Sequence, residues 1–340
     1  MIIIMKPEAT KKQIDYVVEV LDEHGFKTVL NQGDVQTVIA AIGDKPAEST
    51  DEFQLLEGVR SVQRIQVPYK LVSRDSKHED TVITLKNGCK IGGDNPCAIM
   101  AGPCSVESEE GIMEIATFVA SKGAKILRGG AFKPRTGPRA FEGLGEKGLK
   151  YMRAAADKNN LAVITEVMDS ADIDLICEYS DILQVGARNM QNFSLLNKLG
   201  KCGKPVMLKR GMSATVDEWL LAAERLMHHG CEEVIFCERG IRSFDAKYTR
   251  NVGDMAMIPL IQKLSHLPIV FDPSHATGVW SFVPPMAKAA MIAGANGLMI
   301  EVHPRPEKAF SDGPQSLRFN SFEELMKELT ALAPHAYKFS

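Results

Sequence analysis

The sequence predicts a (β/α)8 barrel of the TIM type, an α/β fold, preceded by a small α+β domain of ferredoxin-like (βαββαβ) topology. Three observations carry this prediction. The chain of 340 residues exceeds one small domain. Its first 70 or so residues follow a pattern of their own, and short apolar runs then alternate with amphipathic segments to the end. We place the boundary near residue 75, with domains at 1–75 and 76–340.

Composition and charge exclude several classes of protein. A hydrophobic fraction of 45% and a charged fraction of 24% are ordinary for a globular enzyme. Forty basic and forty-three acidic residues leave a net charge of −3, so we expect no nucleic acid and no membrane as partner. The opening run 1–5 is too short for a membrane span or a leader, which favours a cytoplasmic protein. Seven cysteines without CxxC pairs argue against a disulfide framework.

The front segment predicts four strands and two helices. Ile2–Met5 is a short apolar strand, and Thr10 with Gln13 forms a capping box before a helix that ends at Gly25. The remaining predicted elements are strands at 26–30 and 35–42, a short helix near 51–56 and a strand at 59–67. This order is the split βαβ of a ferredoxin-like domain. Pro68 and the polar stretch 73–80 then predict a linker.

The rest of the chain repeats one unit. After a predicted hairpin at 81–91, apolar runs recur every 20 to 35 residues or so, as expected for β/α units. They lie at 98–101, 124–127, 162–165, 182–185, 206–208, 234–237, 269–271 and 298–300. Capping boxes at Thr215/Glu218 and Ser321/Glu324 predict two of the intervening helix starts. Eight units in about 240 residues match the barrel in count and size, and a doubly wound open sheet is the main rival.

A barrel places its chemistry at the C-terminal ends of its strands, so the residues after each run are the candidate site. One set there is cationic: Arg128, Lys133, Arg135, Arg188, Lys209 and Arg239. Exposure on the surface is the default for such side chains. Six of them on strand ends of one barrel nevertheless indicate a local site for anions, because guanidinium forks suit phosphate and carboxylate oxygens.

A second set has metal-ligand chemistry. Cys104, His275, Glu301 and Asp312 follow strands one, seven and eight, which are neighbours in a closed barrel. A thiolate, an imidazole and two carboxylates suit divalent Mn, Fe, Zn or Co, and the sequence does not choose among them. Each residue alone has an ordinary structural explanation, such as a buried thiol or a helix cap.

Two further carboxylates have open roles. Glu166 could orient a cation, hold a water or pair with an arginine. Asp272 could orient His275 or act as a second group behind a bound metal.

The strand-end residues resemble a known family. The segment 128–136 with its Lys-Pro-Arg-Thr core, Gly-Ala-Arg at 186–188, Leu-Lys-Arg-Gly at 208–211, Glu-Arg-Gly at 238–240 and Asp-Pro-Ser-His at 272–275 are similar to the type I 3-deoxy-D-arabino-heptulosonate 7-phosphate (DAHP) synthases. The resemblance covers roughly residues 80 to 335. The front domain resembles the regulatory extension that one branch of the short DAHP synthases carries.

The resemblance implies condensation of phosphoenolpyruvate with erythrose 4-phosphate, the entry step to aromatic amino-acid biosynthesis, and a divalent metal. By resemblance, the metal ligands are Cys104, His275, Glu301 and Asp312. The groups that hold phosphoenolpyruvate are Arg128, Lys133, Ala187, Arg188, Lys209 and Arg239, and the sugar phosphate falls to Arg135 and Thr136. We count Lys133 (as proton donor), Glu166 (as a group that positions water) and His275 as catalytic. The family also suggests a homotetramer.

The nearest alternative is the sister enzyme that makes 3-deoxy-D-manno-octulosonate 8-phosphate from arabinose 5-phosphate. Its sugar-binding segment is typically built on Asn-Arg-Ser, whereas Pro134-Arg135-Thr136 stands here. The sequence therefore favours the four-carbon sugar.

Two other classes stay open. A Schiff-base aldolase would use Lys209 as nucleophile and needs no metal set. A non-catalytic amino-acid sensor would use the front domain alone and would not need the cationic and metal-ligand residues at the strand ends of the barrel. For that front domain, the resemblance suggests feedback inhibition by tyrosine or phenylalanine, and a purely structural module is the plain alternative.

Overall fold

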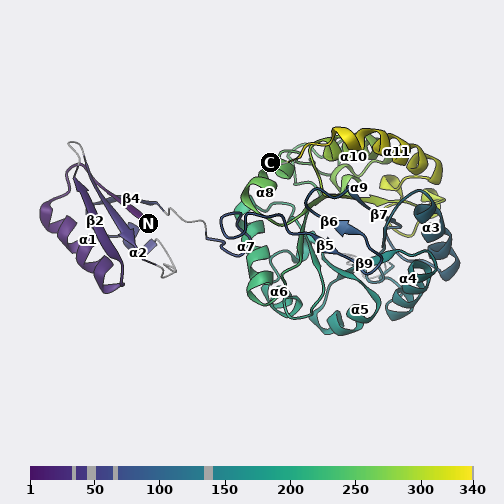
Figure 1. The fold of residues 1–340 in the computed structure, drawn as a ribbon, viewed down its shortest axis with the longest axis horizontal. Helices are drawn as coiled ribbons and strands as arrows, with labels where there is room; N and C mark the ends of the chain where they lie inside the picture. The colour runs from purple at the N-terminus through teal and green to yellow at the C-terminus, as the bar shows by residue number, and fades with distance from the viewer. Residues whose placement is uncertain (33–35, 44–50, 64–67, 134–140, 339–340) are drawn as a thin grey trace. The chain divides into compact units, whose positions relative to one another are not determined.

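The computed structural model describes residues 1–32, 36–43, 51–63, 68–133 and 141–338. The chain forms two compact units, Met1–Pro68 and Tyr69–Ser340 (Figure 1). The boundary predicted near residue 75 falls in the segment that leads from Pro68 to the first hairpin of the second unit.

The first unit confirms the predicted ferredoxin-like topology. Its elements are β1 (Ile2–Met5), α1 (Lys11–Glu23), β2 (Lys27–Gln32), β3 (Thr37–Ile42), α2 (Asp51–Gln54) and β4 (Val59–Gln63). The strands form an antiparallel sheet in the order β2-β3-β1-β4. The capping box is present, since Thr10 Oγ1 accepts from Gln13 N and Gln13 Oε1 accepts from Thr10 N. Parts of two predicted strands, residue 35 and residues 64–67, lie outside the described residues.

The second unit is the predicted barrel. Among the described residues, eight parallel strands close in the order β10-β11-β12-β13-β14-β7-β8-β9. The strands are β7 (Ala98–Gly102), β8 (Ile126–Arg128), β9 (Ala162–Val167), β10 (Ile182–Val185), β11 (Val206–Lys209), β12 (Val234–Glu238), β13 (Ile269–Phe271) and β14 (Gly297–Glu301). Pairing of Gly297 with Ala98 joins the last strand to the first, so the open-sheet alternative is wrong.

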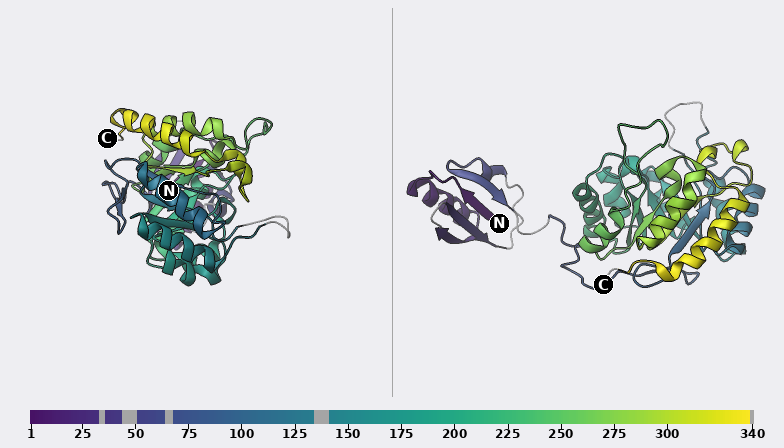
Figure 2. Two further views of the ribbon diagram at one scale, coloured as in Figure 1. Left: turned by 90° about the vertical axis from the view of Figure 1, so that its right-hand side faces the viewer. Right: turned by 90° about the horizontal axis from the view of Figure 1, so that it is seen from above.

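Helices form the outer layer around these strands (Figure 2). They are α3 (Glu109–Ser121), α4 (Glu146–Lys158), α5 (Ile173–Tyr179), α6 (Phe193–Leu199), α7 (Val216–His228), α8 (Met257–Leu264), α10 (Val283–Ile292) and α11 (Phe319–Leu332). The short helix α9 (Pro273–Thr277) directly follows β13, is largely buried and does not belong to this layer. Strands covered on both faces consist mainly of apolar residues, as in Val234–Glu238, whose five residues are all buried and of which only Glu238 is charged. In the described parts of the chain, no helix is long and apolar enough to cross a membrane.

A small hairpin fills the N-terminal end of the barrel. Strands β5 (Ile83–Thr84) and β6 (Lys90–Ile91) lie over the centre of the ring of strands in Figure 1. Ile83 and Ile91 are fully buried and pack on inward-facing barrel residues such as Met207. The hairpin therefore leaves the opposite, C-terminal end for a site.

One of the two predicted barrel capping boxes is present and one is wrong. Thr215 and Glu218 cap α7 reciprocally. Helix α11 instead begins at Phe319 with Arg318 as its N-cap, so Ser321 lies inside the helix. The Phe319 ring stacks on Phe118 at 3.9 Å between centroids, and this packing extends the helix upstream of the local capping signal.

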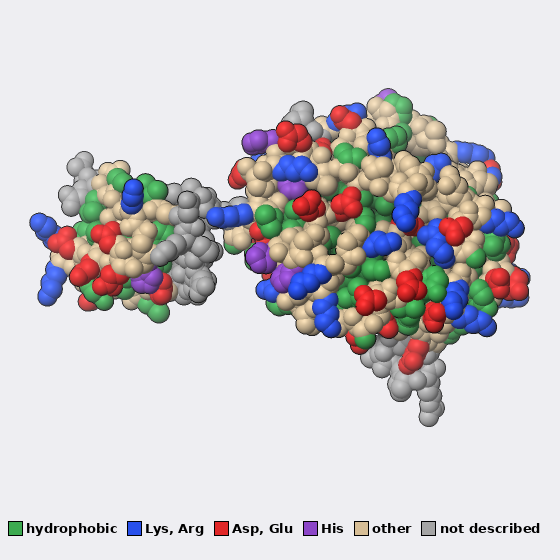
Figure 3. Space-filling view, turned by 60° about the horizontal axis from the view of Figure 1, so that its bottom comes forward, with side chains coloured by type: hydrophobic (Ala, Val, Ile, Leu, Met, Phe, Trp, Pro, Cys, Tyr) green, Lys and Arg blue, Asp and Glu red, His purple; other side chains and the backbone are tan. Residues whose placement is uncertain are grey.

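Surface charges and cysteines match the composition. Basic and acidic side chains are interspersed over the face of the second unit seen in Figure 3, without a large area of one sign. All seven cysteines lie in the described residues and are free thiols.

Candidate functional site

A polar cavity of about 140 Å³ opens at the C-terminal end of the barrel. Its wall includes most of the predicted site residues: Arg128, Lys133, Glu166, Ala187, Arg188, Lys209, Arg239, His275 and Asp312. The strand ends bring these residues together from β8 through β14, as the barrel rule predicts. Arg135 and Thr136 lie outside the described residues.

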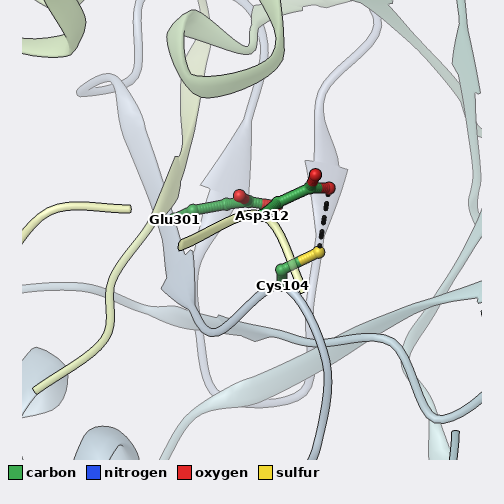
Figure 4. A group of neighbouring side chains, drawn as sticks. All are labelled: Cys104, Glu301 and Asp312. Carbon is green, nitrogen blue, oxygen red and sulfur yellow. Dashed lines mark hydrogen bonds between the residues drawn. The ribbon is translucent and has the colours of Figure 1, made fainter. Parts of the chain in front are cut away.

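Three of the four candidate metal ligands form one cluster. One ligand atom each of Cys104, Glu301 and Asp312 lies within 4.8 Å of the other two (Figure 4). His275 Nε2 lies beside this cluster, 3.6 Å from Glu301 Oε1. A sulfur, an imidazole nitrogen and two carboxylates are the donor set that divalent d-block ions prefer, so the residues present fit such an ion.

The Cys104 thiol sits between an acceptor and a cation. Burial raises its pKa to about 11, and the nearby Glu301 carboxylate adds to this effect. The protonated thiol donates to Asp312 Oδ2 at 3.3 Å. Lys133 Nζ lies 3.0 Å from the same sulfur and donates to the Cys104 carbonyl. A metal cation would favour the thiolate form of this side chain.

Asp272 fixes the orientation of His275. This fully buried residue caps α9, and its Oδ2 accepts from His275 Nδ1 at 2.8 Å and from Lys209 Nζ at 2.6 Å. Burial lowers the pKa of His275, against the opposing effect of Asp272, and so favours the neutral imidazole. With its proton on Nδ1, the ring presents the Nε2 lone pair to Glu301, and two acceptors that face each other fit a cation between them.

Glu301 is held on both of its carboxylate oxygens. Arg128 donates to Oε1 at 2.8 Å, and Gln315 donates to Oε2 at 2.8 Å. Its backbone N–H donates to Ser274 Oγ. The side chain is fully buried, so these contacts fix its position as a ligand.

The cationic wall has unused donor capacity. Arg128 is 5% exposed, and its buried Nε has no hydrogen-bond partner among the described residues. Arg239 is equally buried, and burial lowers its pKa. Its guanidinium makes a long hydrogen bond of 3.5 Å to Gly240 O. Buried guanidinium groups with free N–H donors indicate an anion-binding wall.

Glu166 points into the cavity beside a glycine. A Cβ on Gly186 would lie 1.9 Å from Glu166 Oε1, so only glycine leaves room for the carboxylate in this position. Glu166 lines the same cavity as the candidate ligands His275 and Asp312.

Sequence reasoning missed two residues that support the ligands. Arg250, in the long loop after β12, donates to Asp312 Oδ1 at 3.4 Å and to Gln315 Oε1 at 3.1 Å. Gln315 lies in a turn after Asp312. Neither residue follows a strand end, so the rule that found the other residues had no signal for them.

The fold and the cavity are those of a (β/α)8 barrel enzyme with buried cations beside side chains that could hold a divalent metal. The profile of the DAHP synthetase I family matches residues 80–335, and that of the DAHP synthase ferredoxin-like domain matches residues 1–67. The chain belongs to the DAHP synthetase I family.

Individual relatives agree with this assignment. The chain is 50% identical over 333 residues to the phospho-2-dehydro-3-deoxyheptonate aldolase of Thermotoga maritima, covering 98% of each chain. A crystal structure of that DAHP synthase superposes with a TM-score of 0.92 over 98% of this chain and 97% of the other. The 2-dehydro-3-deoxyphosphooctonate aldolase of Francisella tularensis subsp. holarctica is 32% identical over 72% of this chain and 94% of its own length.

Proposed function

We propose that this protein condenses phosphoenolpyruvate with erythrose 4-phosphate and water to give DAHP and phosphate, the first step of the shikimate pathway. The observation that carries the proposal is one cavity in which buried cations adjoin a cluster of Cys, His, Glu and Asp side chains. The Thermotoga relative, half of whose residues are identical here, bears the name of that activity.

The cations hold phosphoenolpyruvate. Arg128, Lys209 and Arg239 are buried in the cavity wall, and Arg188 joins them from the β10 end. Their donors take up the phosphate and the carboxylate, and contacts to both groups fix the orientation of C3 toward the second substrate. Positioning of this kind supplies a large part of the rate enhancement of two-substrate reactions.

Cys104, His275, Glu301 and Asp312 hold a divalent metal in this proposal. When bound, the metal supplies Lewis-acid polarisation of the aldehyde oxygen of erythrose 4-phosphate. The residues behind the ligands keep them in place: Asp272 fixes the imidazole, and Gln315 with Arg128 fixes Glu301.

Two residues move or direct protons. C3 of phosphoenolpyruvate attacks aldehyde C1, and Lys133 Nζ, which lies in the cavity wall, gives a proton to the aldehyde oxygen. The attack leaves C2 cationic, and Glu166, also in the wall, orients the water that adds there and takes up one of its protons. The C2–O bond to phosphate then breaks, the second proton of the water passes to the leaving group, and C2 becomes the ketone of the product as inorganic phosphate leaves.

The test is consumption of phosphoenolpyruvate by the full chain with erythrose 4-phosphate or arabinose 5-phosphate as co-substrate. We expect turnover with the four-carbon sugar, loss of turnover with a chelator and recovery with added manganese. Consumption of phosphoenolpyruvate with arabinose 5-phosphate but not with erythrose 4-phosphate would assign the sister activity instead. Inactivation by borohydride in the presence of substrate, together with insensitivity to the chelator, would point to a Schiff base on Lys209.

We infer a regulatory role for the front unit, with tyrosine or phenylalanine as effector. The ferredoxin-like topology and the family profile at residues 1–67 support this role. A truncated DAHP synthase from Thermotoga maritima, which matches 78% of this chain at a TM-score of 0.73, supports independent folding of the barrel. Residues 69–340 alone should keep activity and lose inhibition by both amino acids. Inhibition that survives the truncation would refute the role.

Assembly as a homotetramer is part of the same proposal. Sedimentation velocity of the full chain measures the number of subunits directly, and a monomer would contradict the proposed tetramer.

A further inference from the structure

Two loops from distant parts of the chain carry candidate metal ligands. Cys104 lies in the loop after β7, and Asp312 lies in the loop after β14. Cys104 Sγ is 3.3 Å from Asp312 Oδ2, although 208 positions separate the two residues in the sequence. The contacts that bring the two loops together therefore also set the spacing of these ligands.

Glu107 connects the two loops. It follows Cys104 by three residues, and its Oε1 accepts from the Phe310 backbone N–H at 2.7 Å. A carboxylate that accepts from an N–H makes a charge-assisted hydrogen bond, which is stronger than a bond between neutral groups. Phe310 stands two residues before Asp312, so this hydrogen bond lies close to a ligand in each loop.

His303 faces the second oxygen of the Glu107 carboxylate. Its Nδ1 accepts from the Arg305 backbone N–H at 3.1 Å, so the proton of the neutral ring lies on Nε2. That nitrogen lies 3.5 Å from Glu107 Oε2. The side chains of His303 and Glu107 are 11% and 18% exposed, so water screens the contact little. Glu107 therefore holds the loop after β14 near its start, at His303, and again at Phe310.

A second link between the loops lies beside the first. The buried hydroxyl groups of Ser105 and Ser311 hydrogen-bond to each other. Ser105 directly follows Cys104, and Ser311 directly precedes Asp312. Two contacts, the hydroxyl pair and the Glu107 carboxylate, thus hold the ligand-bearing loops together.

The backbone of Asp312 needs support because it is in the left-handed region. Its φ and ψ are 49° and 30°. This conformation is unfavourable for most residues other than glycine and persists where surrounding contacts hold it. On the C-terminal side, the turn Gly313–Gln315 supplies such a contact, since Asp312 O accepts from Gln315 N. On the N-terminal side, the support comes from the contacts of Phe310 and Ser311 with the other loop.

We propose that Glu107 is a positioning residue of the metal site, which ties the loop after β14 to the loop after β7 and so sets the spacing of Asp312 and Cys104. The inference rests on the metal role proposed for these two ligands. Ligands already held at their spacing lose less conformational freedom when an ion binds, so the link raises metal affinity. Groups behind metal ligands typically change affinity by about 10- to 100-fold. Glu107 acts through the backbone of its neighbours, so we expect about 10-fold.

The test is manganese titration of the full chain by electron paramagnetic resonance, with Glu107→Ala compared with Glu109→Ala. Glu109 is exposed in the first turn of α3, so its variant removes the same negative charge nearby without breaking the link between the loops. We expect manganese binding about 10-fold weaker in Glu107→Ala and a change of about two-fold or less in Glu109→Ala. Equal affinity of Glu107→Ala and the unaltered chain overturns the positioning role and leaves the proposed metal site intact. An unaltered chain that binds no manganese overturns the metal site, and this inference with it.

Urea unfolding of the metal-free variants separates positioning from a loss of stability. A purely structural role would lower the unfolding midpoint of Glu107→Ala and leave the manganese affinity of the folded protein unchanged. Glu107→Gln keeps an acceptor for the Phe310 N–H but turns its NH2 toward His303 Nε2, so its affinity should lie between those of Glu107→Ala and the unaltered chain. If Glu107→Ala does not fold, Glu107→Gln is compared with Glu109→Gln. Weaker manganese binding in Glu107→Gln supports the proposal, and equal binding overturns it.

Discussion

Asp272→Asn is the sharpest test of how the candidate metal site is held. Asp272 Oδ2 accepts from both His275 Nδ1 and Lys209 Nζ, and Oδ1 accepts from the backbone N–H of His275. An asparagine can keep the contact to the backbone N–H only by placing its own NH2 against two donors. The imidazole then loses the acceptor that fixes its tautomer, and the Lys209 ammonium loses its buried counter-ion.

The magnitudes follow from burial. Loss of a group behind a metal-binding histidine typically weakens metal affinity by about 10- to 100-fold, which corresponds to about 1.4–2.7 kcal/mol. Removing one partner of a buried ion pair costs about 3–5 kcal/mol of folding stability, and Lys209 is 4% exposed. We therefore expect a variant that folds with reduced stability and needs more manganese for half-maximal occupancy.

Glu238→Gln is the matched control. Glu238 is also fully buried at a strand end, where it pairs with Arg210 at 2.9 Å. It touches none of the candidate ligands in the described chain, and Arg210 keeps Asp254 at 3.3 Å as a second partner. Manganese titration by electron paramagnetic resonance, with urea unfolding alongside, should show weakened metal binding in Asp272→Asn only. Equal loss of metal affinity in both variants, or none in Asp272→Asn, would refute the reasoning.

Three further predictions concern the anion wall, Glu166 and pH. Arg128→Lys should lower kcat/KM by about 10- to 100-fold in steady-state assays, because lysine cannot supply the unpartnered Nε donor while it holds Glu301; an unchanged kcat/KM would contradict this role. Gly186→Ala should displace the Glu166 carboxylate and lower kcat more than it raises KM, since the added Cβ would meet Oε1 at 1.9 Å; unchanged kinetics would exclude Glu166 from the reaction. Burial lowers the pKa of His266 in the folded chain, so below about pH 6.5 the unfolded chain binds more protons at this residue than the folded chain does. The stability that the neutral His266 contributes is therefore present above that pH and is lost as the pH falls below it. Unfolding midpoints measured from pH 8 to about pH 5 should therefore fall less steeply in His266→Gln than in the unaltered chain, and identical slopes would refute this role.

The sequence by itself determined the strands of the barrel. A parallel strand with helices outside and packed side chains inside is buried on both faces, so it reads as a short apolar run, as in Val206–Leu208. The positions of these strands also located the site, because in a barrel the loops that follow the C-terminal ends of the strands carry the chemistry. Arg128, Lys209 and Glu301 were found in this way, since each ends a strand.

The tertiary structure decided what depends on contacts between distant segments. The start of α11 was misplaced because stacking of Phe319 on Phe118 outweighs a local capping signal. Arg250 approaches Asp312 from a loop that carries no periodic pattern. The periodicity of the sequence determines which face of its own strand or helix a residue lies on. Closure of the barrel and packing of the loops determine which side chain from a distant segment that residue contacts.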